Sequence, residues 1–153
     1  MAADARRLHA RRRIPSRGGD PMPPSAHIRS PARTPEDLHA IIQEAINGAD
    51  LDAFLDAHDD DATVVVPPDG RSARGRDEIR AAIAPLLALA PEMATVVVKT
   101  LESDGLALTH GRWRLAVTED GNRSELHGLG TMVSRRRPDG TWRIVLDDPL
   151  SGP

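Results

Sequence analysis

Residues 105–148 read GLALTHGRWRLAVTEDGNRSELHGLGTMVSRRRPDGTWRIVLDD, and this stretch decides the fold. Apolar and polar residues alternate along it in three runs. Two turn signals, Asp120-Gly121 and Arg137-Pro138-Asp139-Gly140, separate the runs. Alternation with a period of two is typical of strands, and Asp-Gly between two such runs is typical of a tight hairpin. The stretch therefore predicts three long antiparallel strands joined by two hairpins.

The part of the chain before this stretch is dominated by helical patterns. Residues 34–37 offer a capping hydroxyl, a proline and two acids, and an apolar stripe then runs to Ile46. Asp50 caps a second, short helix, and a third helix begins near Gly75. β-branched runs predict two further strands, over residues 62–66 and 93–101. Helices early and antiparallel strands late predict an α+β fold, with the helices on one face of the sheet.

The first 33 residues differ in composition from the rest of the chain. They hold eight Arg against two Asp and show no apolar periodicity. Subtracting this net +6 from the −3 of the whole chain leaves −9 for residues 34–153. Because the first segment has too little apolar surface to offset the entropy of ordering it, we expect residues 1–33 to be a disordered Arg/Pro-rich tail. Residues 34–150 are then expected to form a single domain. A transit-like role, or contact with an anionic partner, is the alternative for the tail.

Several classes of protein are disfavoured by composition and motifs. The absence of cysteine excludes disulfides, thiolate nucleophiles and Cys-bound metals. The acidic body argues against a nucleic-acid-binding domain, and the lack of a long apolar run predicts a cytoplasmic protein with no membrane partner. No metal is expected, because His110 and His127 would lie about 13 Å apart at roughly 3.3 Å per residue. No nucleotide fingerprint is present, so we expect no cofactor.

The register of the two hairpins predicts which residues share a face of the sheet. The first turn sets Trp113 opposite Gly128, and the second sets Arg136 opposite Thr141. Because alternate residues point to opposite faces, each face can be read from these pairs. One face collects three glycines, a tryptophan and an aspartate, together with apolar residues: Gly111, Gly128, Gly130, Trp113, Met132, Val145 and Asp147.

We expect this glycine-rich face to lie toward the helices and to hold a ligand pocket. Glycine in a strand gives up packing, so a cluster of glycines leaves room for something else. The expected ligand contacts are Trp113, Gly128, Gly130, Met132 and Val145. A Trp of the core, bonded through its indole N–H, is the alternative for Trp113.

Asp147 is the candidate catalytic residue, as a general base or a ligand anchor, because it ends a strand amid this apolar face. The alternative is that Asp147 or Asp148 satisfies backbone donors before Pro149. His58 is expected at the C-terminal end of the second helix, in a capping or solvated role, where a positive charge suits the helix dipole.

The opposite face of the sheet is also apolar. In a monomer whose helices cover only one side of the sheet, the other side faces water and is usually polar. We expect this face to form a homodimer interface. Its residues in the predicted register are Leu129, Val133, Trp142, Ile144 and Leu146.

Four short segments resemble a known family. They are Asp50-Leu51-Asp52, DDATV at 60–64, GRDEI at 75–79 and GTWRIV at 140–145. Over roughly residues 35–149 the chain resembles the SnoaL-like, ketosteroid-isomerase-like family of the nuclear-transport-factor-two-like superfamily. The resemblance implies a cone-shaped barrel of three helices from the N-terminal half, packed on a strongly curved, mainly antiparallel sheet of about six strands. It also implies a pocket within the cone and commonly a homodimer through the outer face.

The resemblance does not extend to the steroid isomerase mechanism. The position of the general base in ketosteroid isomerases corresponds to Val66, and the chain has no Tyr to form their oxyanion hole. We therefore expect a protein that binds a small molecule, with proton-transfer chemistry of the isomerase or cyclase type on an apolar substrate. A non-catalytic dimerisation or ligand-sensing module is the alternative, and an adaptor that binds its partner through residues 1–33 is a third.

Overall fold

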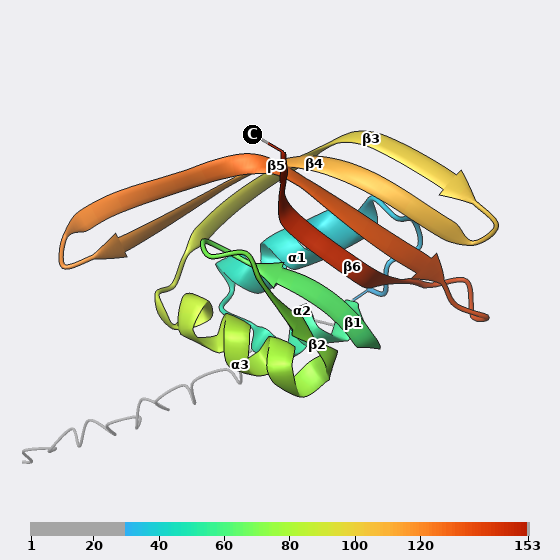
Figure 1. The fold of residues 1–153 in the computed structure, drawn as a ribbon, viewed down its shortest axis with the longest axis horizontal. Helices are drawn as coiled ribbons and strands as arrows, with labels where there is room; N and C mark the ends of the chain where they lie inside the picture. The colour runs from blue at the N-terminus through green and yellow to red at the C-terminus, as the bar shows by residue number, and fades with distance from the viewer. Residues whose placement is uncertain (1–29, 153) are drawn as a thin grey trace, which may run out of the picture.

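The computed structural model describes residues 30–152, so residues 1–29 of the predicted tail lie outside the described part of the chain. Three helices lie on one side of a curved sheet (Figure 1). The elements in chain order are α1 Asp37–Asn47, α2 Leu51–Asp56, β1 His58–Val66, β2 Arg71–Arg74, α3 Gly75–Ala88, β3 Glu92–Ser103, β4 Leu106–Glu119, β5 Asn122–Arg136 and β6 Trp142–Gly152. None of these helices is long and apolar enough to cross a membrane.

The sheet has six strands in the order β2-β1-β6-β5-β4-β3, and β2 and β3 are its edges, so it does not close. Strand β1 runs parallel to β6, while the other neighbours are antiparallel. The long hairpin of β4 and β5 extends well past the helices (Figure 1). The predicted α+β class, with three helices on a curved, mainly antiparallel sheet of about six strands, is confirmed.

The second helix begins as the sequence predicts, whereas α1 begins at Asp37, two residues after the predicted first position at Pro35. The backbone N–H of Asp37 donates to the Thr34 hydroxyl at 3.3 Å, and the N–H of Thr34 donates back to the Asp37 carboxylate at 2.9 Å. This reciprocal pair satisfies donors that the first turn of α1 would leave unpaired. At α2, the Asp50 side chain accepts a hydrogen bond from the N–H of Ala53 at 3.0 Å.

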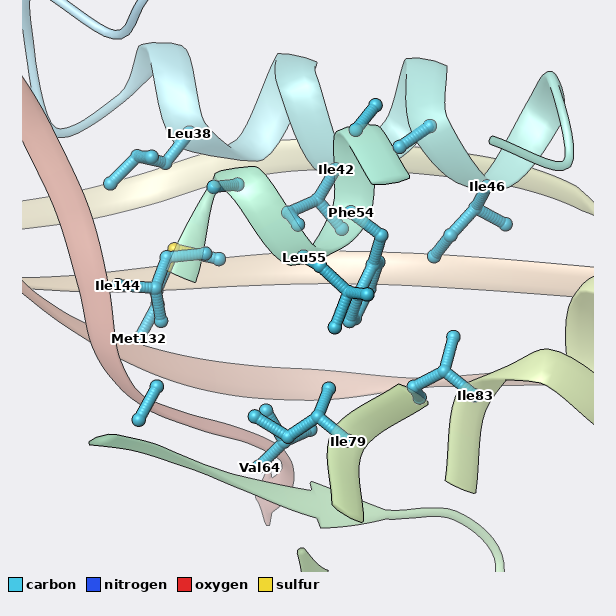
Figure 2. Packing of buried hydrophobic residues seen from close by; sticks show 14 of the residues in the cluster. Leu38, Ile42, Ile46, Phe54, Leu55, Val64, Ile79, Ile83, Met132 and Ile144 are labelled. Atoms are coloured by element: carbon cyan, nitrogen blue, oxygen red, sulfur yellow. The ribbon is translucent and has the colours of Figure 1, made fainter. Parts of the chain in front are cut away.

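The hydrophobic core lies between the three helices and the concave side of the sheet. Figure 2 shows side chains of α1, α2 and α3 converging on residues of β1, β5 and β6. The labelled residues are Leu38, Ile42, Ile46, Phe54, Leu55, Val64, Ile79, Ile83, Met132 and Ile144. Helix α3 contributes Ile79 and Ile83 from one face, four residues apart, as its apolar spacing requires.

The predicted register of the first hairpin is confirmed. Trp113 lies opposite Gly128, and Gly111 lies opposite Gly130. The alternation of burial along β4 shows which face is concave, because Ala107 and Thr109 are buried while Arg112 is exposed. The concave face of β4 therefore carries the odd-numbered residues, as predicted.

The predicted register of the second hairpin is wrong, by one residue next to the turn and by two residues beyond Val145. Arg136 pairs with Trp142 rather than with Thr141. The physical reason is the side chain of Asp139, which accepts hydrogen bonds from both the backbone N–H and the hydroxyl of Thr141, at 2.9 and 2.6 Å. These bonds hold Thr141 within the turn, so the loop is one residue longer than its Pro-Asp-Gly motif suggests.

This shift places two residues of the predicted dimer face in the core. The exposed fraction of Trp142 is 5% and that of Ile144 is 0%, and both belong to the core cluster. The register shifts again between Val133 and Ser134, which leaves Val145 outside the pairing. This β-bulge restores the predicted facing beyond it. Asp147 therefore lies on the concave side, and Leu146 is 50% exposed.

Candidate functional site

Asp147 lies on the concave side of β6, between two buried apolar residues of the neighbouring strands. Its register partners are Val64 of β1 and Met132 of β5, both members of the core cluster. The Asp147 side chain is nevertheless 16% exposed. The carboxylate thus stands at the edge of the core and keeps part of its surface in contact with solvent.

His58 lies directly behind this carboxylate. Its Nε2 is 3.9 Å from Oδ2 of Asp147, and only 2% of the residue is exposed. Nδ1 is 2.7 Å from the carbonyl oxygen of Phe54, and because a carbonyl only accepts, Nδ1 carries a hydrogen. The prediction of a capping role is met in that the ring binds a carbonyl of α2, but His58 is buried rather than solvated and opens β1.

The other nitrogen of His58 has no hydrogen-bond partner among residues 30–152. Nε2 is the buried side-chain nitrogen or oxygen that remains unsatisfied in this part of the chain. Buried polar atoms are nearly always bonded in native proteins, and an orphan calls for an explanation. The orphan here points toward the candidate catalytic carboxylate.

His39 of α1 is a third polar residue near the site, and sequence reasoning missed it. Its Nε2 lies 2.7 Å from the Thr109 hydroxyl, which in turn donates to the Met132 carbonyl at 3.4 Å. His39 therefore donates through Nε2. Burial lowers the pKa of His39, and the negative charges of Asp147 and Glu36 oppose this only in part.

The sequence held one signal for His39. It precedes Ile42 by three positions and Ile46 by seven, so it continues the apolar stripe of α1. Its partner on the sheet is Gly111. A Cβ added at Gly111 would lie 2.7 Å from Cε1 of His39, closer than side chains approach one another. The glycine thus makes room for the imidazole of α1.

The other two glycines of the cluster accommodate Trp113 and the backbone of β6. The Trp113 indole N–H donates to the carbonyl oxygen of Pro149 at 2.7 Å, which holds the ring across the sheet. A Cβ at Gly128 would meet Cζ2 of Trp113 at 3.0 Å, and one at Gly130 would meet Cα of Pro149 at 3.1 Å. Trp113 remains half-buried, so its ring also presents surface to solvent.

The remaining predicted ligand contacts are divided by the bulge. Met132 is buried beside Asp147, whereas Val145 sits in the bulge, half-buried and without a cross-strand partner. Two surface hollows lie elsewhere. One of about 1030 Å³ runs along α1 past Ile41, and a smaller one borders Arg136 at the second hairpin.

The chemistry that this arrangement supports is acid–base chemistry. A partly exposed carboxylate and a buried imidazole with one unpaired nitrogen lie 3.9 Å apart on the concave side, and the charge of Asp147 also acts on the His39 imidazole, whose pKa burial lowers. Within residues 30–152 no three His, Asp or Glu side chains are grouped so that they could hold a metal ion. Carboxylates and imidazoles at the edge of an apolar core are the usual proton-transfer groups of enzymes.

Solved structures identify the class of fold. A ketosteroid isomerase-like protein from Erwinia carotovora atroseptica has a TM-score of 0.66 and 19% identity, with 73% of this chain and 88% of that chain covered. A putative calcium/calmodulin-dependent protein kinase type II association domain from Thiobacillus denitrificans has a TM-score of 0.66 and 21% identity, covering 80% and 100%. A nuclear-transport-factor-two-like protein with a cystatin-like fold from Novosphingobium aromaticivorans has a TM-score of 0.62 and 19% identity, covering 72% and 75%. The fold is therefore nuclear-transport-factor-two-like.

The family follows from the sequence itself. The model of the SnoaL-like domain matches residues 38–145, from the start of α1 to the bulge of β6. The chain belongs to the SnoaL-like domain family, and the predicted resemblance is confirmed. A search of the curated proteins finds no match.

Proposed function

We propose that this protein binds a small, mainly apolar molecule at the concave side of its sheet and transfers a proton with Asp147 as the acid–base residue. The observation that carries the proposal is the position of the Asp147 carboxylate, which is 16% exposed and flanked by core residues. Residues 34–150 form the ligand-binding domain in this proposal.

The surroundings of Asp147 favour an uncharged ligand. Met132 lies next to it, and Trp113, whose indole is bonded to the Pro149 carbonyl two residues along β6, offers a partly exposed aromatic face. Ligand sites are typically apolar walls with a few placed polar groups. In this proposal the ligand contacts Trp113 and Met132, and Gly128, Gly130 and Val145 shape the backbone around them.

The proposed reaction moves a proton between two atoms of the substrate. The ionised carboxylate takes a proton from a weakly acidic C–H group, and the electron pair stays on the substrate, delocalised onto an adjacent carbonyl oxygen. The carboxylic acid then returns the proton to a different atom. Proton transfer by a positioned side chain contributes about 10²- to 10⁴-fold to a rate.

Asp147→Asn is expected to lower the rate of this chemistry by about 10²- to 10⁴-fold while leaving the thermal midpoint nearly unchanged. The amide has the size of the carboxylate but cannot accept the proton. The measurement is deuterium incorporation from D₂O into a panel of uncharged, enolisable ketones, followed by NMR with wild type and variant.

Asp148→Asn provides the matched control. Asp148 is the next residue along β6, it pairs with Thr131, and its carboxylate accepts from the N–H of Leu150 at 3.0 Å. Its variant should exchange deuterium at the wild-type rate. Equal rates for Asp147→Asn and wild type would remove Asp147 from the reaction.

A second candidate function, a non-catalytic dimerisation or ligand-sensing module, is favoured by the outer face of the sheet. Four apolar residues face one another in register across β3, β4, β5 and β6. They are Leu101, Leu108, Val133 and Leu146, of which Leu101 and Leu146 are 53% and 50% exposed. In one chain this row is open to water, and contiguous exposed apolar patches mark interaction sites.

We propose that two copies of the chain pair through this row, extended by Leu129, which lies four residues from Val133 along β5. The expected result is a mass near twice 16.5 kDa by light scattering, and Leu146→Arg should give the mass of one chain. An unchanged thermal midpoint in the variant would show that the fold itself is intact. A wild type with the mass of one chain would contradict the dimer and leave the concave site unaffected.

A further inference from the structure

We infer that Asp147 and His58 hold one proton between them and act as a single acid–base unit, with His58 as the positioning residue behind the carboxylate. The catalytic role of this unit rests on the proposed function, whereas the shared proton is inferred from the unsatisfied Nε2 of His58 alone.

Because of the tautomer of His58, the pair of His58 and Asp147 needs one proton between Nε2 and the carboxylate. Nδ1 must donate to the Phe54 carbonyl at 2.7 Å, so in a neutral imidazole Nε2 is a bare lone pair. That lone pair faces Oδ2 of Asp147 at 3.9 Å. If Asp147 were also ionised, two acceptors would face each other in a buried setting, with no donor from residues 30–152 between them. A single proton, on either Nε2 of His58 or Oδ2 of Asp147, allows a hydrogen bond between these two atoms after a small movement of the carboxylate.

Within residues 30–152, two other titratable groups near the pair, His39 and Asp59, already have partners. His39 of α1 already donates its Nε2–H to Thr109, and burial lowers its pKa. Asp59, the next residue along β1, is paired with Arg137 at 3.2 Å and faces Arg135 at 3.9 Å. The ring of His58 otherwise packs against Phe54, with 4.7 Å between ring centroids. Asp147 is therefore the group that Nε2 faces.

The shared proton fits the proposed reaction without any further reactant. When a substrate C–H bond breaks, its hydrogen joins the Asp147 carboxyl, and the pair then holds two protons. When that hydrogen returns to another atom of the substrate, the pair again holds the one proton with which it began. His58 fixes one carboxyl oxygen through this proton and leaves the other for the substrate.

The test is NMR of the full chain at pH 7, labelled with ¹⁵N in histidine and ¹³C in the aspartate carboxyls. We expect the wild type to show a proton either on Nε2 of His58 or on the Asp147 carboxyl. A bare Nε2 together with an ionised Asp147 would overturn the inference. The His58 signals are assigned by their loss in His58→Gln.

Asp147→Asn supplies the second measurement and keeps the buried imidazole in place. The asparagine amide donates an N–H to Nε2, so His58 should carry its hydrogen on Nδ1 alone. Asp148→Asn should leave the wild-type spectrum unchanged. A proton that persists on Nε2 in Asp147→Asn would show that the imidazole holds it without Asp147, and this too would overturn the inference.

The kinetic readout separates positioning from folding. His58→Gln is expected to lower the deuterium-exchange rate while leaving the KM of the ketone within about twofold of wild type, because Asp147 loses its partner but the apolar walls remain. If the wild type shows the shared proton but no deuterium exchange, the proposed function is wrong and the shared proton stands. If it shows deuterium exchange but no shared proton, the shared proton is wrong and the proposed function stands.

Discussion

Trp142→Arg is expected to abolish the cooperative folded state or to lower the unfolding free energy by about 4 kcal/mol or more. Trp142 is 5% exposed and belongs to the core cluster under the helices. The substitution removes its buried apolar surface and places a guanidinium among the buried apolar residues of the core. Chemical denaturation followed by circular dichroism measures the loss.

Leu146→Arg is the matched variant, because it introduces the same charge four residues further along β6 on the opposite face. Leu146 is 50% exposed, and its arginine can extend into water, so the unfolding free energy of the single chain should change little. If both variants unfolded alike, the burial of Trp142 would not be the cause. If Trp142→Arg stayed folded and lost only its dimer, Trp142 would have to lie on the outer face of the sheet. This outcome would contradict the register of β6.

Gly111→Ala is expected to cost about 2 kcal/mol, because the added methyl group overpacks a filled site. Its Cβ would lie 2.7 Å from Cε1 and 2.8 Å from Nδ1 of His39. The ring cannot move away without losing its hydrogen bond to Thr109, and the strand cannot move without breaking its pairing with Gly130. Denaturant midpoints of wild type and variant measure the cost.

A double-mutant cycle tests that cause. In His39→Ala the space above the strand is open, so adding Gly111→Ala should cost little or nothing in that background. The coupling between the two positions is then close to the full effect of the single variant at Gly111. Strictly additive effects would show that the cost arises from the backbone conformation of Gly111 rather than from its contact with the imidazole.

The helices and the first hairpin were predictable because their signals are local. The Thr34–Asp37 motif and Asp50 satisfy backbone donors within a few residues of themselves. The Asp120-Gly121 turn fixes the register of β4 and β5, and once one pair is fixed, period-two alternation fixes the rest. The face of the sheet on which Trp113 and Gly128 lie could therefore be predicted from this turn alone.

The second hairpin was mispredicted because its register depends on contacts that a turn motif does not reveal. Two hydrogen bonds from Thr141 to Asp139 lengthen the loop, and a bulge at Val145 then adds a second shift, which restores the predicted facing of the residues beyond it. A slip of one residue moves each side chain to the other face. Trp142 and Ile144 therefore entered the core, while Asp147 and Leu146 kept their predicted sides.

By itself, the sequence determined the α+β class and the family, and it pointed to Asp147 as the candidate acid–base residue. Those features rest on periodicity, turn chemistry and short motifs, which act over a few residues. Only the tertiary structure brought His58 to 3.9 Å from Asp147 and seated His39 on Gly111. These residues lie on separate elements, and their meeting is decided by how the helices pack on the curved sheet.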